Sequence, residues 1–394
     1  MEFVRKAYGD KKRKRQASSS KCISRADRVF KHCVFFHKFV GIWLEKERSQ
    51  RLLDRLKGYV SAAFTLGICI FQIVMLSVES SSVVTVLHNA MEAMVSIAAT
   101  VKVAPIVLKR NNLLILIRKT KEIAAPLDAS KINERKIVDR WLNNQDKILK
   151  ILLTSYTFTF SSYTLFPLLK ENGLPFTGRL PAICYVNPWY PTIFAVQLVF
   201  IIFRFVCVLS NDILCITFLC QLCSELELVK HLIVDLGNGK DRNVKQIIIR
   251  HAMVLDYGEI VCETYSATLI MQHLNCSMFL CLSGLVTMKT SDMFALLKIG
   301  SLSLIGIITM LIISFVGEMV MSSSLEIAST IESSVYKGYR NDVANLKLLN
   351  FMLMRAQKPL CMMVCTQGKL SLRFFSENIN KVASFFIYLK TLVE

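Results

Sequence analysis

The chain has 394 residues, of which 53% are hydrophobic, and it carries a formal net charge of +19 with a mean hydropathy of +0.44. Long uncharged blocks exclude an ordinary soluble domain, and the scarcity of Gly and Pro excludes a collagen-like or low-complexity chain. The positive charge lies between the apolar blocks, so it predicts contact with the anionic leaflet of a lipid bilayer and no nucleic-acid partner. Few segments alternate with a period of two, so we expect helices, and not an outer-membrane barrel, to cross the membrane.

Seven segments are expected to cross the bilayer as α-helices. In chain order they run from 58 to 78, about 81 to 108, 151 to 169, about 192 to 222, 264 to 288, 299 to 317 and about 370 to 393. The last segment is the weakest by hydropathy because charged residues interrupt it. A stretch rich in Pro and aromatic residues follows the third segment and predicts an ordered outer loop.

Lys and Arg are unevenly distributed between these segments. The four stretches assigned to the cytoplasm are 1–57, 109–150, 224–252 and 322–358, and together they hold 38 of the 48 basic residues. This bias predicts a cytoplasmic N-terminus. Seven spans then place the C-terminus outside the cell, which is the reverse of a G-protein-coupled receptor. We expect no cleavable signal peptide in the basic N-terminal stretch.

Helical patterns continue beyond the apolar blocks on the cytoplasmic side. Residues 131–150 and 224–263 are polar but carry apolar residues at helical spacing. The predicted fold class is therefore an all-α membrane protein with seven transmembrane helices, in which extensions of helices four to seven form a cytoplasmic anchor bundle.

The last helix carries a polar stripe. Arg373, Glu377 and Lys381 recur every four residues on an otherwise apolar helix. Because charge at membrane depth usually faces protein or water, the stripe predicts a water-filled pore lined by this helix in an oligomer. The alternative is that the stripe is buried against other helices, with Arg373 and Glu377 as an ion pair.

Three C-terminal motifs carry a family resemblance. Residues 346–360 read LKLLNFMLMRAQKPL and are similar to the LMRSQKPL signature of insect odorant receptors. Residues 370–375 and 384–389 resemble two further motifs of that family, although its usual Thr-Phe is Phe374-Phe375 here. The link at 237–243 is too short to match the insertion of the family's co-receptor, so the chain resembles an odour-tuning subunit.

The resemblance implies a subunit of an odorant-gated, non-selective cation channel. It implies a hetero-oligomer with the co-receptor, of tetrameric form, in the plasma membrane of olfactory sensory neuron dendrites. The chain then divides into a basic N-terminal segment (1–57), transmembrane helices one to six (58–320), a cytoplasmic anchor segment (321–369) and a pore-lining helix (370–394).

A small apolar odorant is expected to bind in the outer half of the helix bundle. The candidate ligand-binding residues are His88, Met91, Tyr156, Phe160, Tyr163, Gln197, Phe200, Met278 and Cys281. Ordinary packing between helices is the competing interpretation of each of them. Glu92 and Arg204 stand out as polar residues inside the membrane. The candidate pore and gate residues are Ser384, Tyr388, Thr391 and Leu392.

Other classes of protein fit the sequence less well. A metabotropic seven-helix receptor without a pore is opposed by the charge bias, and a transporter is opposed because no two related halves are visible. A gustatory-receptor-like channel subunit differs only in its C-terminal motif. No hydrolase, metalloprotease or phosphate-binding motif is present, so we expect no enzyme activity, no metal site and no cofactor.

Overall fold

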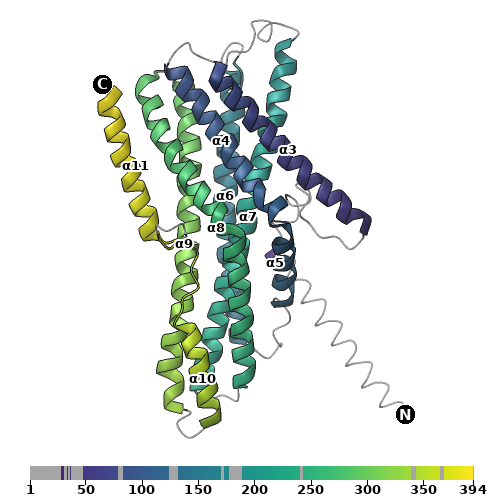
Figure 1. Ribbon diagram of the computed structural model, residues 1–394, viewed down its shortest axis with the longest axis vertical. Helices are drawn as coiled ribbons and strands as arrows, with labels where there is room; N and C mark the ends of the chain where they lie inside the picture. The colour runs from purple at the N-terminus through teal and green to yellow at the C-terminus, as the bar shows by residue number, and fades with distance from the viewer. Residues whose placement is uncertain are drawn as a thin grey trace.

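The computed structural model describes residues 28–30, 33, 36, 48–78, 83–123, 132–169, 173–176, 189–239, 243–338, 343–363 and 368–393. Its helices are α3 (Arg48–Val78), α4 (Val83–Leu108), α5 (Arg110–Ile123), α6 (Ile132–Leu168), α7 (Trp189–Gly237), α8 (Val244–Lys289), α9 (Met293–Gly338), α10 (Val343–Ala356) and α11 (Leu372–Val393) (Figure 1). Most of the predicted basic N-terminal segment and outer loop lies outside the described residues. Within the described part, helices and loops account for everything except one isolated β-bridge between Met363 and Lys369.

Three helices are much longer than a membrane is thick. Helix α7 has 49 residues, and α8 and α9 have 46 each. At about 1.5 Å per residue α7 is about 74 Å long, whereas the hydrocarbon core is about 30 Å thick. These helices therefore continue beyond the bilayer and form the lower bundle in Figure 1, which confirms the predicted extension of the fourth and fifth membrane helices.

The third predicted span and the polar stretch before it form one continuous helix, α6, of 37 residues. Among the described helices, five are long and apolar enough to cross a membrane by these criteria alone, namely α3, α4, α7, α8 and α9. Helices α6 and α11 fall short because Ser, Thr, Tyr and charged residues lower their hydropathy. Their place beside the other five gives the bundle its seven spans.

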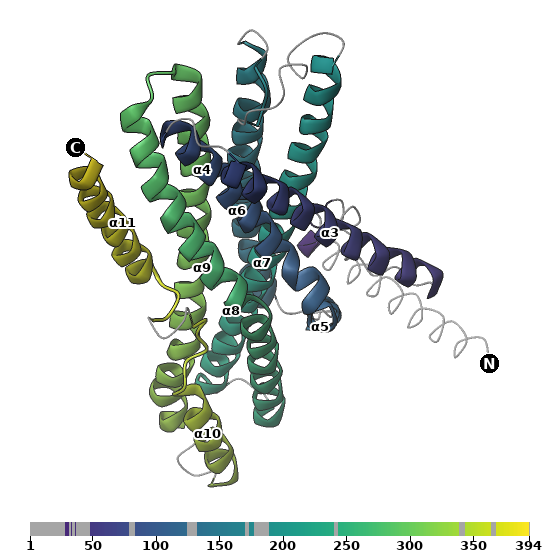
Figure 2. The ribbon, with the colours of Figure 1, turned by 45° about the horizontal axis from the view of Figure 1, so that its top comes forward.

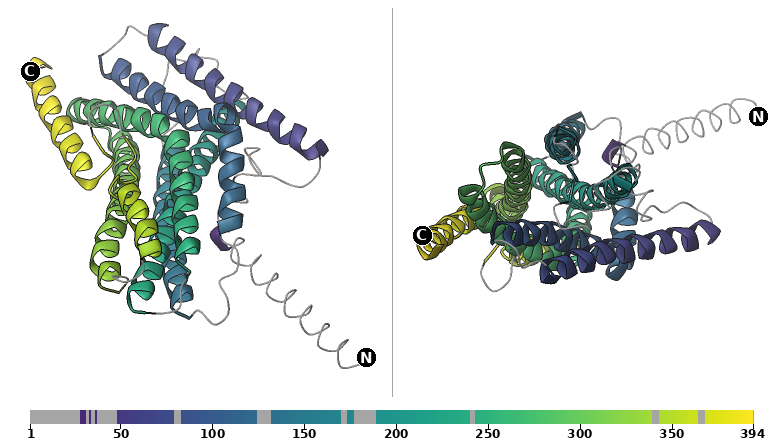
Figure 3. Two further views of the ribbon diagram at one scale, coloured as in Figure 1. Left: turned by 60° about the horizontal axis from the view of Figure 1, so that its bottom comes forward. Right: turned by 90° about the horizontal axis from the view of Figure 1, so that it is seen from above.

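The core of the molecule surrounds α7. Every residue of α7 from Leu209 to Leu226 is buried, including the charged residues Asp212 and Glu225, so this stretch is surrounded by protein on all sides. Helices α6, α8 and α9 pack around it, and the view from above places it inside the bundle (Figure 3).

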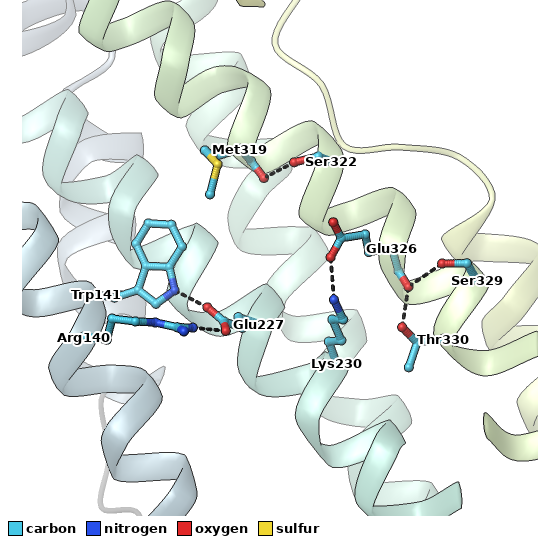
Figure 4. A network of polar contacts seen from close by, with 9 residues as sticks. All are labelled: Arg140, Trp141, Glu227, Lys230, Met319, Ser322, Glu326, Ser329 and Thr330. Atoms are coloured by element: carbon cyan, nitrogen blue, oxygen red, sulfur yellow. Dashed lines mark hydrogen bonds and ion pairs between the residues drawn. The ribbon is translucent and has the colours of Figure 1, made fainter. Parts of the chain in front are cut away.

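Polar contacts connect the cytoplasmic ends of α6, α7 and α9 (Figure 4). The Trp141 indole Nε1 of α6 donates to Glu227 Oε2 of α7 at 2.5 Å, and Arg140 pairs with the same carboxylate. Lys230 of α7 pairs with Glu326 of α9 at 2.6 Å. Half-exposed pairs of this kind contribute little free energy, so their main effect is to define how the helices align.

The stretch that carries the family signature packs on the cytoplasmic bundle. Its buried residues are Leu349, Met352, Ala356 and Leu360. The backbone N–H of Leu360 donates to Ser324 Oγ at 3.0 Å, and its side chain lies over Gly258 of α8. A Cβ at Gly258 would come within 2.1 Å of Leu360 Cδ2, so a larger residue at this position would displace the Leu360 side chain.

Helix α11 stands at the edge of the bundle, where it packs against α8 and α9 (Figures 1 and 2). Much of its remaining surface is exposed, including the apolar side chains of Phe385 and Ile387. An apolar surface of this kind at membrane depth faces either lipid or another subunit.

Candidate ligand cavity and pore helix

A cavity of about 110 Å³ lies between α4, α6, α7, α8 and α9. Most of its wall is apolar, and it is lined by Val95, Ala98, Lys102, Tyr156, Arg204, Phe205, Val208, Gln272, Asn275, Cys276, Phe279, Leu302, Ile305, Gly306 and Thr309. A buried cavity of about 150 Å³ is enough to hold benzene. Because the cavity is smaller than this, it suits only a very small organic molecule unless the helices rearrange.

A buried ion pair borders the cytoplasmic side of this cavity. Lys102 of α4 lies 2.7 Å from the Oδ2 atom of Asp212 on α7. The Tyr156 hydroxyl of α6 donates to the same oxygen at 2.7 Å. Since a buried charge is stable only when it is paired, these contacts hold three helices in fixed positions around the cavity.

A second buried cluster borders the outer side. Glu92 of α4 pairs with Lys298 of α9 at 2.7 Å and with Arg204 of α7 at 3.7 Å, and it accepts a hydrogen bond from the Tyr163 hydroxyl of α6. Lys298 also donates to the Pro175 carbonyl at 2.7 Å, which ties the cluster to the outer loop. Four helices therefore meet at the Glu92 carboxylate, and Lys298 connects the outer loop to them.

The aromatic residues predicted on α6 form a contact surface for the cavity wall. Tyr156, Phe160 and Tyr163 share a face of α6, and their rings lie 6.1, 5.7 and 6.4 Å from the ring of Phe205 in edge-on geometry. Phe205 lines the cavity. Of these three residues only Tyr156 also lines it directly.

The remaining candidates on α4 and α7 lie around the cavity rather than in its wall. Met91 is buried against the cavity residue Phe279, and His88 is half-buried about one turn away. Gln197 Oε1 accepts from the backbone N–H of Phe176 at 2.9 Å. Phe200 lines a separate groove of about 560 Å³ between α3 and α7.

Met278 and Cys281 lie on other faces of α8. The Met278 side chain is 57% exposed on the outer surface of the protomer. Cys281 is buried with its Sγ 3.8 Å from the Val382 carbonyl of α11. The cavity is lined instead by Gln272, Asn275 and Cys276, which the sequence analysis missed. Helix α8 is apolar over most of its circumference, so spacing alone could not identify its inward face.

The candidate pore residues lie on the exposed side of α11. Tyr388 is 58% exposed, and its carbonyl accepts from Thr391 Oγ1 at 2.7 Å. Ser384 Oγ donates to the Asn380 carbonyl within the helix at 3.0 Å. The side chain of Leu392 lies outside the described residues.

The polar stripe of α11 begins with an ion pair. Arg373 Nε lies 2.8 Å from Glu377 Oε1, one turn along the helix. The Arg373 side chain is nevertheless 88% exposed in the single subunit. The pairing expected for a buried stripe is thus present, while the stripe itself faces away from the bundle.

Helix α8 connects the cavity to α11. The Asn378 side chain donates to Ser277 Oγ at 2.9 Å. Further out, Phe386 packs so closely on Gly284 that a Cβ there would come within 2.6 Å of its ring. One face of α8 therefore lines the cavity while a neighbouring face packs against α11.

The fold and the cavity define a polytopic helical membrane protein with a mostly apolar cavity between its helices. The family model described as 7tm Odorant receptor matches residues 82–382. The chain therefore belongs to the odorant receptor family. No curated protein sequence matches it.

Two solved structures have the same fold. The insect olfactory receptor OR5 from Machilis hrabei in complex with eugenol has a TM-score of 0.79 and 15% identity, over 93% of this chain and 100% of that one. The structure of the same receptor described without eugenol has a TM-score of 0.78 and 14% identity, over 92% and 99% of the two chains. These likenesses confirm the seven-helix, all-α membrane fold predicted from the sequence.

Proposed function

We propose that the chain is an odour-tuning subunit of a ligand-gated, non-selective cation channel. A small and mostly apolar odorant binds in the cavity that is lined by α4, α6, α7, α8 and α9. Family membership supports this proposal, together with a cavity whose wall is mainly apolar and whose polar groups are few. The dendritic plasma membrane of an olfactory sensory neuron is the corresponding location.

The observation that carries the proposal is the double role of α8. Gln272 and Cys276 line the cavity, and Ser277 and Gly284 on the same helix contact α11. A ligand that draws α8 inward also moves the contact surface of α11. Binding opens the pore only if the ligand has a higher affinity for the open arrangement than for the closed one.

The exposed surface of α11 supports assembly around a central pore. The side chains of Phe385, Ile387 and Tyr388 are each more than half exposed in a single subunit. In a tetramer with the co-receptor, one part of this surface would contact neighbouring subunits and another part would face the water of the pore. Tyr388 is then the gate residue, with Ser384 and Thr391 on the adjoining pore surface.

Whole-cell recording tests the channel proposal. Cells expressing the chain with an insect co-receptor are exposed to an odorant panel while G-protein signalling is blocked. We expect a fast cation current that survives the block and whose odour profile depends on this chain. A response that disappears under the block would overturn the channel and support a metabotropic receptor.

Substitution of Tyr388 tests the gate. We expect Tyr388→Ala to change single-channel conductance and cation selectivity, because a bulky side chain at a constriction is lost. Met278→Ala is the control, since Met278 is equally exposed but lies on the outer surface of α8. Unchanged conductance and selectivity in Tyr388→Ala would remove this residue from the pore.

A further inference from the structure

The buried charges around the cavity do not balance. The cationic side chains are Lys102, Arg204 and Lys298, the anionic ones are Glu92 and Asp212, and each of these residues is at most 7% exposed. Among the described residues that border the cavity, this leaves one positive charge in excess. An unbalanced buried charge is unfavourable in a medium of low dielectric constant unless another group compensates it.

The geometry identifies Arg204 as the cation with the poorest partners. Lys102 has a carboxylate oxygen at 2.7 Å, and so does Lys298. Arg204 reaches Glu92 only at 3.7 Å and Ser96 Oγ at 3.4 Å, both through Nη1. Its Nε and Nη2 atoms are buried without a hydrogen-bond partner among the described residues.

Aromatic rings cover the faces of this guanidinium, while its Nε and Nη2 groups have no hydrogen-bond partner among the described residues. The Arg204 Cζ atom lies 5.4 Å from the centre of the Tyr163 ring and 5.3 Å from that of Phe176. Stacking of this kind holds the guanidinium plane in place. A pre-oriented planar group with free N–H donors is suited to a carbonyl or carboxylate oxygen.

Arg204 and Gln272 both belong to the cavity wall. Gln272 Oε1 is likewise buried without a hydrogen-bond partner in the described part of the chain. Most of the remaining wall is apolar, including Val95, Phe279 and Leu302. The cavity thus combines a mostly apolar wall with a cationic side chain, two of whose nitrogen atoms have no acceptor among the described residues.

We infer that the cavity selects small molecules that join a short apolar body to a carbonyl-type oxygen, which accepts hydrogen bonds from Arg204. This inference rests on the proposed function, because it names the ligand class of the same cavity. A carboxylate compensates the excess charge and a neutral carbonyl supplies only the acceptor, so the two differ in strength. Hydrocarbons lack the acceptor, and ammonium groups add to the excess positive charge.

Binding to the purified full-length chain with its co-receptor tests the inference without recording a current. Butane, butylamine, butan-2-one and butanoate, which are small enough for the cavity, are compared by the thermal stabilisation that each gives. We expect butan-2-one or butanoate to bind at least about tenfold more tightly than butane, and butylamine to bind no better than butane. Equal binding of all four, or binding of none, would overturn the inference.

Two variants with the same change in charge test the role of Arg204. Arg204→Met removes the donor and is expected to abolish the preference for the carbonyl compounds. Lys298→Met removes one positive charge from a residue outside the cavity wall. It is expected to keep the preference for the neutral ketone, which needs only the Arg204 donor, and to weaken the preference for the carboxylate, because the excess charge is gone. Surface labelling establishes that each variant folds and reaches the plasma membrane. The comparison of the four compounds on the wild-type chain tests the inference even if one variant does not.

The outcomes separate this inference from the channel proposal. Selective binding of carbonyl compounds with no odorant-gated current would retain the ligand class and overturn the channel. A current with equal potency for butane and butan-2-one would retain the channel and overturn the ligand class. Loss of selectivity in both variants would assign the preference to overall charge and overturn the contact with Arg204.

Discussion

Replacement of Lys102 by methionine is predicted to destabilise the membrane bundle strongly. Lys102 Nζ lies 2.7 Å from Asp212, and the two side chains are only 5% and 1% exposed. Methionine keeps much of the volume but leaves a buried carboxylate without its cation, a change that costs about 3–5 kcal/mol. Asp212 Oδ1 has no hydrogen-bond partner among the described residues, whereas Oδ2 keeps the Tyr156 hydroxyl. We therefore expect a loss near the lower limit, about 3 kcal/mol.

A double variant shows whether charge is the cause. Lys102→Met with Asp212→Asn removes both charges and keeps a polar partner for Tyr156, so we expect its free energy of unfolding to return to within about 1.5 kcal/mol of the wild-type value. The assay is unfolding by increasing SDS in mixed micelles. Lys109→Met is the control, because its pair with Glu263 is exposed and is worth about 1 kcal/mol or less. A Lys102→Met variant no less stable than this control would refute the reasoning.

Two further contacts give predictions of definite sign. Gly284→Ala should push α11 away from its own bundle toward the axis of the proposed pore, and so raise the odorant concentration that gives half-maximal current. Phe386→Leu in the same chain should partly reverse that increase. Dose–response curves check this, and an unshifted curve for Gly284→Ala would contradict it. Leu360→Ala should lower the free energy of unfolding by about 2–5 kcal/mol through loss of buried packing on Gly258, as measured by SDS unfolding. An unchanged unfolding midpoint would show that this contact contributes nothing to stability.

The sequence predicted the membrane fold well because uncharged blocks of about 20 residues have few other uses. It also predicted the helical extensions, since apolar residues at helical spacing continue through 224–263. The union of 131–150 with the third span was not predicted, because the change from polar to apolar composition at Lys150 resembles an end and not a continuation. Composition reports where a helix enters lipid, and it does not report where the helix ends.

The cavity was harder to predict, and the reason lies in α8. A helix in contact with lipid on one side and protein on the other is apolar on both, so Met278 and Cys276 look alike in the sequence. The structure places the first on the outer surface and the second in the cavity wall. The better signal was charge at membrane depth: Glu92 and Arg204 stood out in the sequence and meet at the cavity's outer end.

The size of the contact inferred for Arg204 limits how a ligand opens the proposed channel. One charge-assisted hydrogen bond is worth about 1.5–3 kcal/mol, or roughly 10- to 150-fold in affinity. A shift from about 1% open to about 99% open requires a preference of about 10⁴-fold for the open state. The contact with Arg204 is therefore insufficient even if it forms only in the open state. The remainder must come from closer apolar packing as α8 moves inward, or from ligands in several subunits acting on one pore. Because Gly284 and Phe386 are already in tight contact, we expect even a small movement of α8 to displace α11.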